Sequence, residues 1–368
     1  MPSKKGRVVT TMNLTLSYPA NAAVLYWMII GQVAGAVCWI NSDGEATPVQ
    51  VGDDCDTYQS VLAPGGITIP LEGDITSARI SLCVGSPLAI NIVTDGNGNP
   101  NVQDAVSWLP TDPNYDKVWD KIEFTVTGGQ IWANTTGVDF FGIPTVLSVS
   151  NGSTTLETAP LVGDRASVFD DFASLGSPWS DLAVGGAARV LAPGYGQDFP
   201  TDYLDRYIDQ CWTDLDQSAG GSITLSLSGG PAGYVSATGS VVGTDLVMVD
   251  NLNNTYTVAK PSSMDVFLCN GALNIDGDLP PLLQQVDGII KRQIGAGLNR
   301  GVLCAKHRCD VNGFYPPGVP TNLYSEALHL SYVGGLAYGF AYDDVCNLYS
   351  STLSVPDVTE MTVTVSGV

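Results

Sequence analysis

Residues 117–143 read KVWDKIEFTVTGGQIWANTTGVDFFGI, and this stretch decides how the fold is interpreted. From residue 121 to residue 127 apolar and polar side chains alternate, which is the period of a β-strand with one buried face. The polar face carries Glu123, Thr125 and Thr127. Gly128 and Gly129 follow, and paired glycines supply the positive φ angles of a tight turn. The sequence therefore predicts a β-hairpin.

The predicted second strand of this hairpin runs from Ile131 to Phe141. Asp139 has the opposite parity to the polar face of this strand, so it joins that face only through a β-bulge, which we expect at Gly137. Regular pairing would leave Asp139 about 16 Å further along the strand than Glu123. Bringing the two carboxylates together therefore requires the strand to bend. The polar face itself carries Trp132, Asn134 and Thr136.

The chemistry of these side chains favours an uncharged ligand. Two carboxylates, an indole and several hydroxyls, with only Lys117 and Lys121 as nearby cations, suit a neutral polyhydroxylated molecule better than a phosphate. Carbohydrate is the ligand class that we expect. On residue chemistry alone a second interpretation stays open, since Asp and Glu on strands are usually solvated surface residues.

The same residues, in the same spacing, are similar to a known family. Trp119 to Thr125, followed by Trp132 to Gly142, resembles the signature of glycoside hydrolase family 64, whose members are β-1,3-glucanases related in fold to thaumatin-like proteins. The resemblance implies an inverting hydrolysis with Glu123 as general acid and Asp139 as general base. It also implies a set of residues that line the sugar subsites, in which Thr127 stands where the family is expected to have asparagine: Thr125, Thr127, Trp132, Asn134 and Thr136.

The activity implied by the resemblance is cleavage of β-1,3-glucan of the laminarin or curdlan type, with release of laminari-oligosaccharides such as laminaripentaose. No cofactor or metal is implied, and we expect a monomer. A non-catalytic thaumatin-like protein that binds glucan or acts against fungi would share the cleft without turnover. A structural surface or adhesion protein would not bind the glucan at all.

The composition favours a mainly β fold with an α/β part, because 44% of residues are hydrophobic, 14% are charged, and 41 glycines and 22 prolines supply many turns. Helical spacing begins at three places: behind Asp164, after Pro200 and at Pro280. We therefore expect a β-barrel or sandwich domain of residues 1–163 and 300–368, which the family resemblance implies to be thaumatin-like. An inserted mixed α/β domain of residues 164–299 would form the other wall of a wide cleft.

The segment from Tyr338 to Val345 is predicted to be a strand near the end of the chain and contains a second pair of carboxylates. Neighbouring residues of a strand point to opposite faces, so Asp343 and Asp344 are not expected to act on one bond. We interpret them as structural hydrogen-bonding residues. His307 and His329 are interpreted as structural or surface residues.

The formal net charge of −22 argues against nucleic acid and anionic membrane surfaces as partners, since both attract Lys and Arg. The apolar run from Val24 to Ile40 contains Gln32 and ends at a turn, so it predicts two buried strands and no membrane span. A neutral glucan is compatible with the acidity of the chain.

Eight cysteines without CxxC spacing, and only two histidines, make disulfides a better interpretation than a zinc site. The local candidates are Cys38–Cys55 and Cys304–Cys309. The first fifteen residues lack the apolar segment of a signal peptide, so the sequence does not resemble an intact secretory precursor. We nevertheless expect an extracellular protein, because the even cysteine count is accompanied by four N-glycosylation sequons: Asn13, Asn134, Asn151 and Asn253.

Overall fold

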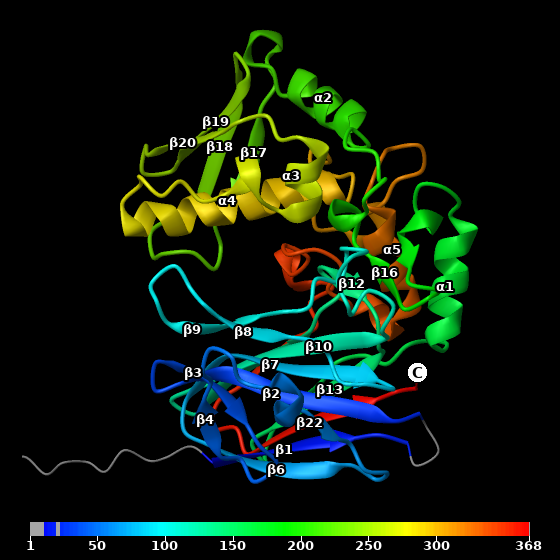
Figure 1. The fold of residues 1–368 in the computed structure, drawn as a ribbon. Helices are drawn as coiled ribbons and strands as arrows, with labels where there is room; N and C mark the ends of the chain where they lie inside the picture. The colour runs from blue at the N-terminus through cyan, green and yellow to red at the C-terminus, as the bar shows by residue number, and fades with distance from the viewer. Residues whose placement is uncertain (1–10, 20–22, 368) are drawn as a thin grey trace, which may run out of the picture.

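Two stacked β-sheets form one part of the protein, and a part that contains most of the helices lies above them (Figure 1). The structure is a computed structural model that describes residues 11–19 and 23–367. The predicted absence of a signal-peptide core concerns mainly residues 1–10, which lie outside the described residues.

The lower sheet has five strands, and it joins the beginning of the chain to its end. Strands β1 and β22 pair in parallel, whereas the other neighbours are antiparallel. In spatial order the strands are β14 (Thr155–Glu157), β13 (Thr145–Ser150), β22 (Glu360–Val365), β1 (Thr11–Ser17) and β6 (Ile67–Glu72).

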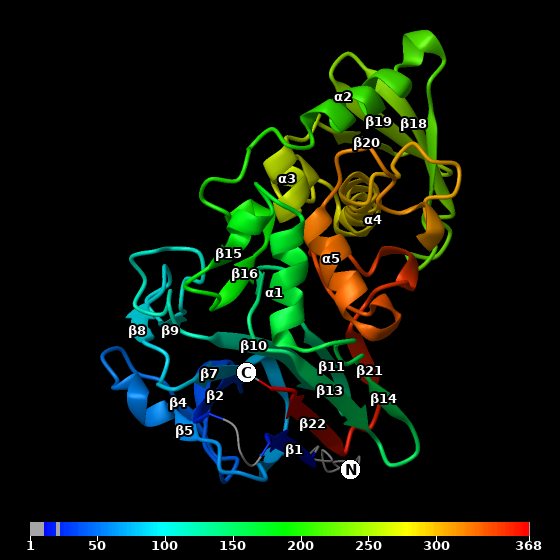
Figure 2. The same cartoon turned by 90° about the vertical axis from the view of Figure 1, so that its right-hand side faces the viewer.

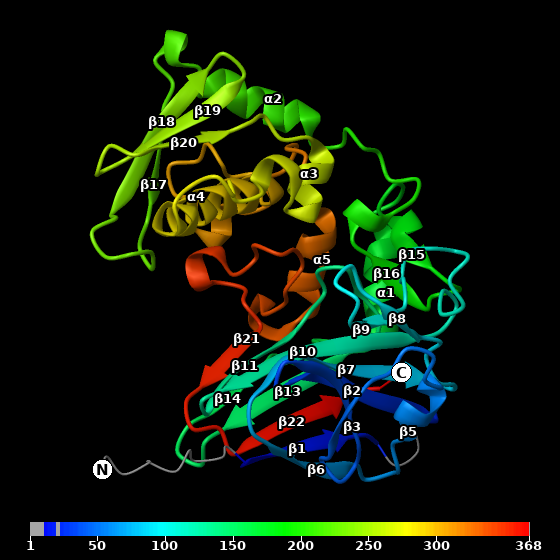
Figure 3. The ribbon, with the colours of Figure 1, turned by 60° about the vertical axis from the view of Figure 1, so that its left-hand side comes forward.

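The upper sheet has eight strands, all antiparallel, and it carries the predicted hairpin. Figure 3 shows its strands lying over those of the lower sheet. In spatial order the strands are β21 (Thr352–Val355), β11 (Gln130–Thr135), β10 (Trp119–Thr127), β7 (Ile75–Val84), β2 (Leu25–Val33), β3 (Ala36–Ile40) and β4 (Ala46–Pro48), with β5 (Ser60–Val61) beside β2.

An apolar core fills the space between the two sheets. Ile122, Phe124 and Val126 of β10 belong to it, together with apolar residues of β1, β2, β7, β13 and β22. The alternation predicted for β10 is therefore confirmed, and its polar side chains face away from the sandwich interior. Because the core takes every second residue, the register of β10 is fixed and Glu123 is held on the outer face.

The upper part combines small sheets with five α-helices. A four-stranded antiparallel sheet contains β17 (Ile223–Ser226), β18 (Ser236–Val242), β19 (Asp245–Asp250) and β20 (Thr255–Val258). The helices are α1 (Arg165–Ser174), α2 (Asp205–Asp214), α3 (Ser263–Leu268), α4 (Pro281–Asn299) and α5 (Leu323–Ser331). Figure 2 shows α1 and α5 side by side between the sandwich and the four-stranded sheet.

Short elements complete the chain. A hairpin of β8 (Asn91–Thr94) and β9 (Pro100–Gln103) precedes β10, and β12 (Phe140–Phe141) pairs with β16 (Arg189–Leu191), which pairs with β15 (Ala183–Val184). The 3₁₀ helices are η1 (Cys55–Tyr58), η2 (Ser180–Leu182), η3 (Pro193–Tyr195), η4 (Gln217–Ala219), η5 (Gly271–Leu273), η6 (Val311–Gly313), η7 (Val333–Gly335) and η8 (Val345–Asn347).

The three predicted helices are confirmed as α1, α2 and α4. Asp164 caps α1 by accepting a hydrogen bond from the backbone N–H of Ser167, whose side chain completes a capping box. The helix α4 begins at Pro281, where a missing N–H costs nothing.

The prediction of strands and loops after residue 300 is partly wrong. Helix α5 was not predicted, because its side chains are buried on most sides and the sequence lacks a polar stripe. The segment from Tyr338 to Val345 is a series of turns and not a strand. Asp343 of this segment is fully buried, where it pairs with Arg300.

The predicted disulfides are wrong. Cys309 bonds to Cys346, with 5.6 Å between their Cα atoms, so neither Cys304 nor the Cys38–Cys55 pair is bridged. The bond joins the segment after α4 to the segment that leads into β21, a contact between residues 37 positions apart that spacing does not reveal.

The apolar run from Val24 to Ile40 forms β2 and β3, as predicted. Among the described residues, no helix is both long and apolar enough to cross a bilayer.

Candidate active site

The outer face of the upper sheet arranges polar side chains in rows across its strands. Glu123 of β10 lies opposite Asn134 of β11 on one side and Arg79 of β7 on the other. One row away, Thr125 lies opposite Trp132. Residues opposite one another on antiparallel strands share a face, so these side chains project together from the sheet.

These rows line an open hollow of about 340 Å³. The indole of Trp132 is 47% exposed, which is unusual for so large an apolar side chain and leaves much of the ring accessible to a ligand. Of the seven predicted site residues, Glu123, Thr125, Trp132 and Asn134 line this hollow. Thr127 is exposed at the end of the strand and is not part of the lining.

The second strand of the hairpin is shorter than predicted, and the expected bulge at Gly137 is wrong. β11 ends at Thr135, after which the N–H of Gly137 donates to Tyr338 O at 2.9 Å and its carbonyl accepts from Tyr324 Oη at 2.6 Å. A Cβ at position 137 would lie 2.8 Å from Leu328 of α5. Glycine therefore lets the chain pass close to α5 and turn back over the sheet.

This turn brings Asp139 to β10. Its Oδ2 lies 2.6 Å from Nζ of Lys121, which occupies the same face of β10 as Glu123, two residues earlier. Two residues of a strand span about 7 Å, so Asp139 pairs with a residue that lies about 7 Å along β10 from Glu123, and the chain does not continue as the regular hairpin that would place Asp139 about 16 Å further along. Lys121 also lines a small pocket together with Thr136, the remaining predicted subsite residue.

The backbone directly after β16 helps to hold Asp139. The N–H of Ala192 donates to Asp139 O at 2.9 Å, next to the pairing of β12 with β16. Tyr195 follows in η3 and stacks on Trp108 with ring centroids 4.2 Å apart. Burial, and then the charge and hydrogen bonding of Asp139, raise the pKa of the Tyr195 hydroxyl. The segment from Ala192 to Tyr195 therefore contacts Asp139, the residue predicted to be the general base.

The sequence did not predict that Glu123 and Asp139 would each pair with a cationic side chain. Nε of Arg79 lies 3.3 Å from Oε1 of Glu123, and Nη1 of the same guanidinium donates to Asp104. The parity of Lys121 with Glu123 was a signal in the sequence. No such signal existed for Arg79, because its position depends on which strand pairs with β10.

Comparison with known proteins places the chain in a family. Residues 10–365 match the β-1,3-glucanase family of glycoside hydrolases, family 64. The chain belongs to glycoside hydrolase family 64. It is 25% identical over 367 residues to a glucan endo-1,3-β-glucosidase of Cellulosimicrobium cellulans, covering 92% of this chain and spanning 62% of the length of that relative.

Solved structures of family 64 proteins share the fold. A laminaripentaose-producing β-1,3-glucanase in complex with laminaritetraose is 26% identical, with a TM-score of 0.83 over 97% of this chain and 98% of that one. A β-1,3-glucanase domain from Clostridium beijerinckii is 23% identical, with a TM-score of 0.82 over 97% of this chain and 98% of that one. This second similarity is one of fold.

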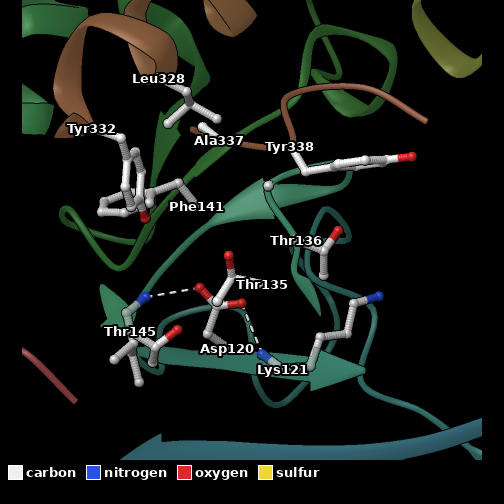
Figure 4. Close-up of a pocket in the computed structure, with 12 residues that line it drawn as sticks. Asp120, Lys121, Thr135, Thr136, Phe141, Thr145, Leu328, Tyr332, Ala337 and Tyr338 are labelled. Atoms are coloured by element: carbon white, nitrogen blue, oxygen red, sulfur yellow. Dashed lines mark hydrogen bonds between the residues drawn. The ribbon is translucent and has the colours of Figure 1, made fainter. Parts of the chain in front are cut away.

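A third carboxylate, Asp120, directly precedes Lys121 on β10. It is buried, and it accepts hydrogen bonds from the backbone N–H groups of Gly142 and Ile143 at 2.9 Å and of Lys121 at 2.8 Å. Figure 4 shows its carboxylate directed at the main chain. Burial raises the pKa of Asp120 to about 6, although the three N–H donors oppose the shift. Asp120 fixes the turn that follows Asp139.

Asp343 and His329 have structural surroundings. Asp343 lies 3.0 Å from Arg300 Nη2 and 3.1 Å from His329 Nε2, and all three side chains are buried. Asp344 instead pairs with Arg292. Among the described residues, no cluster of three or more His, Cys, Asp or Glu side chains could hold a metal ion.

Proposed function

We propose that this chain hydrolyses β-1,3-glucan with inversion at the anomeric carbon, with Glu123 as general acid and Asp139 as general base. The observation that supports the proposal is that, in a family 64 chain, Asp139 pairs with Lys121 on the same face of β10 that carries Glu123. Glu123 lies in the hollow, and Asp139 is bound to Lys121 two positions away along β10. An inverting pair must leave room for a water molecule, at a carboxyl separation of about 6.5–9.5 Å.

In the proposed reaction Glu123 donates its proton to the glycosidic oxygen as the bond to the anomeric carbon breaks. Asp139 takes a proton from a water molecule whose oxygen bonds to the opposite side of that carbon. One product gains a hydroxyl at the former glycosidic oxygen, and the other gains a reducing end in the α configuration. The exposed indole of Trp132 would support a sugar ring whose hydroxyls Thr125 and Asn134 would bond, whereas Thr127 and Thr136, outside the hollow, would contact neighbouring sugar units of the glucan chain.

A solved structure of similar fold supports the substrate class. One neighbour of the same fold is described as laminaripentaose-producing and is bound to laminaritetraose. We propose that this chain likewise acts on laminarin or curdlan and releases laminari-oligosaccharides such as laminaripentaose. In this proposal a thaumatin-like domain of residues 1–163 and 300–368 and a mixed α/β domain of residues 164–299 flank a wide substrate cleft. The enzyme would work outside the cell as a monomer.

The test measures hydrolysis of laminarin by the reducing ends that it releases. Glu123→Gln and Asp139→Asn should each reduce kcat by about 10²- to 10⁴-fold, the usual contribution of a general acid or base. Azide needs no deprotonation to attack, so it should restore part of the activity of Asp139→Asn and none of that of Glu123→Gln. Proton NMR should show the α anomer as the first product.

The matched control is Glu157→Gln, which removes an exposed strand carboxylate from the lower sheet and should leave activity unchanged. Binding of laminarin without any release of reducing ends would instead support the non-catalytic glucan-binding alternative. Full activity in Glu123→Gln would exclude this residue as the acid.

A further inference from the structure

One guanidinium connects two carboxylates on the open face of the upper sheet. Arg79 projects from β7 directly opposite Glu123, with its Nε 3.3 Å from Glu123 Oε1. Its Nη1 donates to Oδ2 of Asp104, the residue that follows β9. A guanidinium presents five N–H donors in a rigid plane, so it can hold both partners in a fixed relative orientation.

The cluster is a surface arrangement and not part of the apolar core. The side chains of Arg79, Glu123 and Asp104 are 43%, 39% and 49% exposed. Arg79 and Glu123 line the 340 Å³ hollow, and Arg79 with Asp104 lines the adjoining hollow of about 310 Å³ over β2 and β7. Exposed ion pairs contribute little to stability, about 1 kcal/mol or less, so fold stability does not account for this arrangement.

We propose that Arg79 and Asp104 are positioning residues that act on Glu123, Arg79 by orienting its carboxyl group and Asp104 by balancing the charge of Arg79. Their role depends on the proposed function of Glu123 as the general acid. An acid must hold a proton until the glycosidic bond breaks, whereas a guanidinium beside it favours proton loss. The negative charge of Asp104, which pairs with the same guanidinium, offsets the tendency of Arg79 to favour proton loss from Glu123.

The other neighbours of Glu123 in the described part of the chain contribute no unpaired charge, so the charge beside its carboxyl group is set by Arg79 and Asp104. On β11 the residue opposite Glu123 is the neutral Asn134. On β10 the nearest charged side chain of the same face is Lys121, which is paired with Asp139. Arg79 of β7 is therefore the charged side chain in contact with Glu123, and Asp104, just after β9, pairs with the same guanidinium.

The proposal predicts opposite effects for two substitutions. Asp104→Asn leaves Arg79 with Glu123 alone, so the alkaline limb of the kcat/KM profile should move to lower pH. Arg79→Gln removes the cation and leaves two carboxylates near one another, so the limb should move to higher pH. Each shift should be about half a pH unit, as expected for an exposed pair. A general loss of structure cannot produce shifts of opposite sign.

The experiment compares pH profiles of laminarin hydrolysis for the wild-type chain and both variants. The control is Asp209→Asn, which breaks the comparably exposed Lys260–Asp209 pair of α2 and should leave the profile unchanged. Carbon NMR titration of the Glu123 carboxyl, assigned with Glu123→Gln, should show the same opposite shifts. Shifts of the same sign, or none, overturn the inference. If the wild-type chain releases no reducing ends, the proposed function fails, and the NMR titration alone decides whether Arg79 and Asp104 act on Glu123.

Discussion

Asp120 shows how a single buried residue can make stability depend on pH. Burial raises its pKa to about 6 from an ordinary value of 3.8. Between pH 4 and 6 the folded chain therefore holds up to one more proton than the unfolded chain. Its contribution to stability is complete below pH 4, falls as pH rises through 6, and is constant above that. The total fall is about 3 kcal/mol.

Asp120→Asn should abolish this dependence, because the amide does not titrate. We expect the free energy of unfolding of wild type to exceed that of the variant by more at pH 4 than at pH 7. Urea denaturation of both chains across this range measures the difference, in which the other carboxylates cancel. A difference that is constant with pH would contradict the raised pKa.

At the same scale, the sequence could predict residues whose position depends on strand alternation. Glu123, Thr125, Trp132 and Asn134 were found together because β10 and β11 form one local hairpin. Arg79 comes from a strand about forty residues earlier, and its pairing with Glu123 depends on which strand lies beside β10, which alternation does not specify.

At the scale of elements, Arg189 of β16 anchors the loop that precedes β10. The residue is fully buried, and its guanidinium donates to four backbone carbonyls, those of Ser107, Asn114, Tyr115 and Lys117. Arg189→Met should destabilise the fold by about 3 kcal/mol or more, because these buried acceptors lose charged donors.

Hydrogen exchange locates this effect. Amides of residues 105–117 should exchange faster in Arg189→Met than in wild type, whereas amides of β1 and β22 should respond only through global stability. Arg189→Lys is the matched control, since it keeps the charge but cannot span four carbonyls, and it should be intermediate. Unchanged exchange in the loop would show that Arg189 does not anchor it.

Elements with a local signal were predicted from the sequence, and those defined by long-range contacts were not. Asp164 and the proline at 281 mark the starts of α1 and α4 with side-chain or ring chemistry. The end of β11 at Thr135 has no such mark, because it depends on the approach of Gly137 to α5. Helix α5 is itself buried on most sides, so its own sequence gave no amphipathic period.

At the scale of the whole molecule, the closing contacts join distant parts of the chain. The parallel pairing of β1 with β22 brings residues near both ends into one sheet, and Cys309–Cys346 links two segments beyond α4. A mainly β fold could be predicted from composition and alternation. The partner of each end strand and of each cysteine could not, because many pairings satisfy the same pattern.

The net charge of −22 is a property of the whole chain, and it makes a prediction about substrate charge. A neutral glucan experiences no long-range repulsion, so kcat/KM on laminarin should change little between 10 and 200 mM NaCl. A carboxymethylated β-1,3-glucan is repelled at low salt, where the Debye length is about 30 Å, and much less near 0.15 M, where it is about 8 Å. The kcat/KM for the carboxymethylated glucan should therefore rise severalfold with salt.

A methylated glucan of equal substitution controls for the bulk of the substituent and should behave like laminarin. An equal salt response of the charged and neutral polymers would mean that the acidity of the chain does not reach the face that carries Glu123 and Trp132.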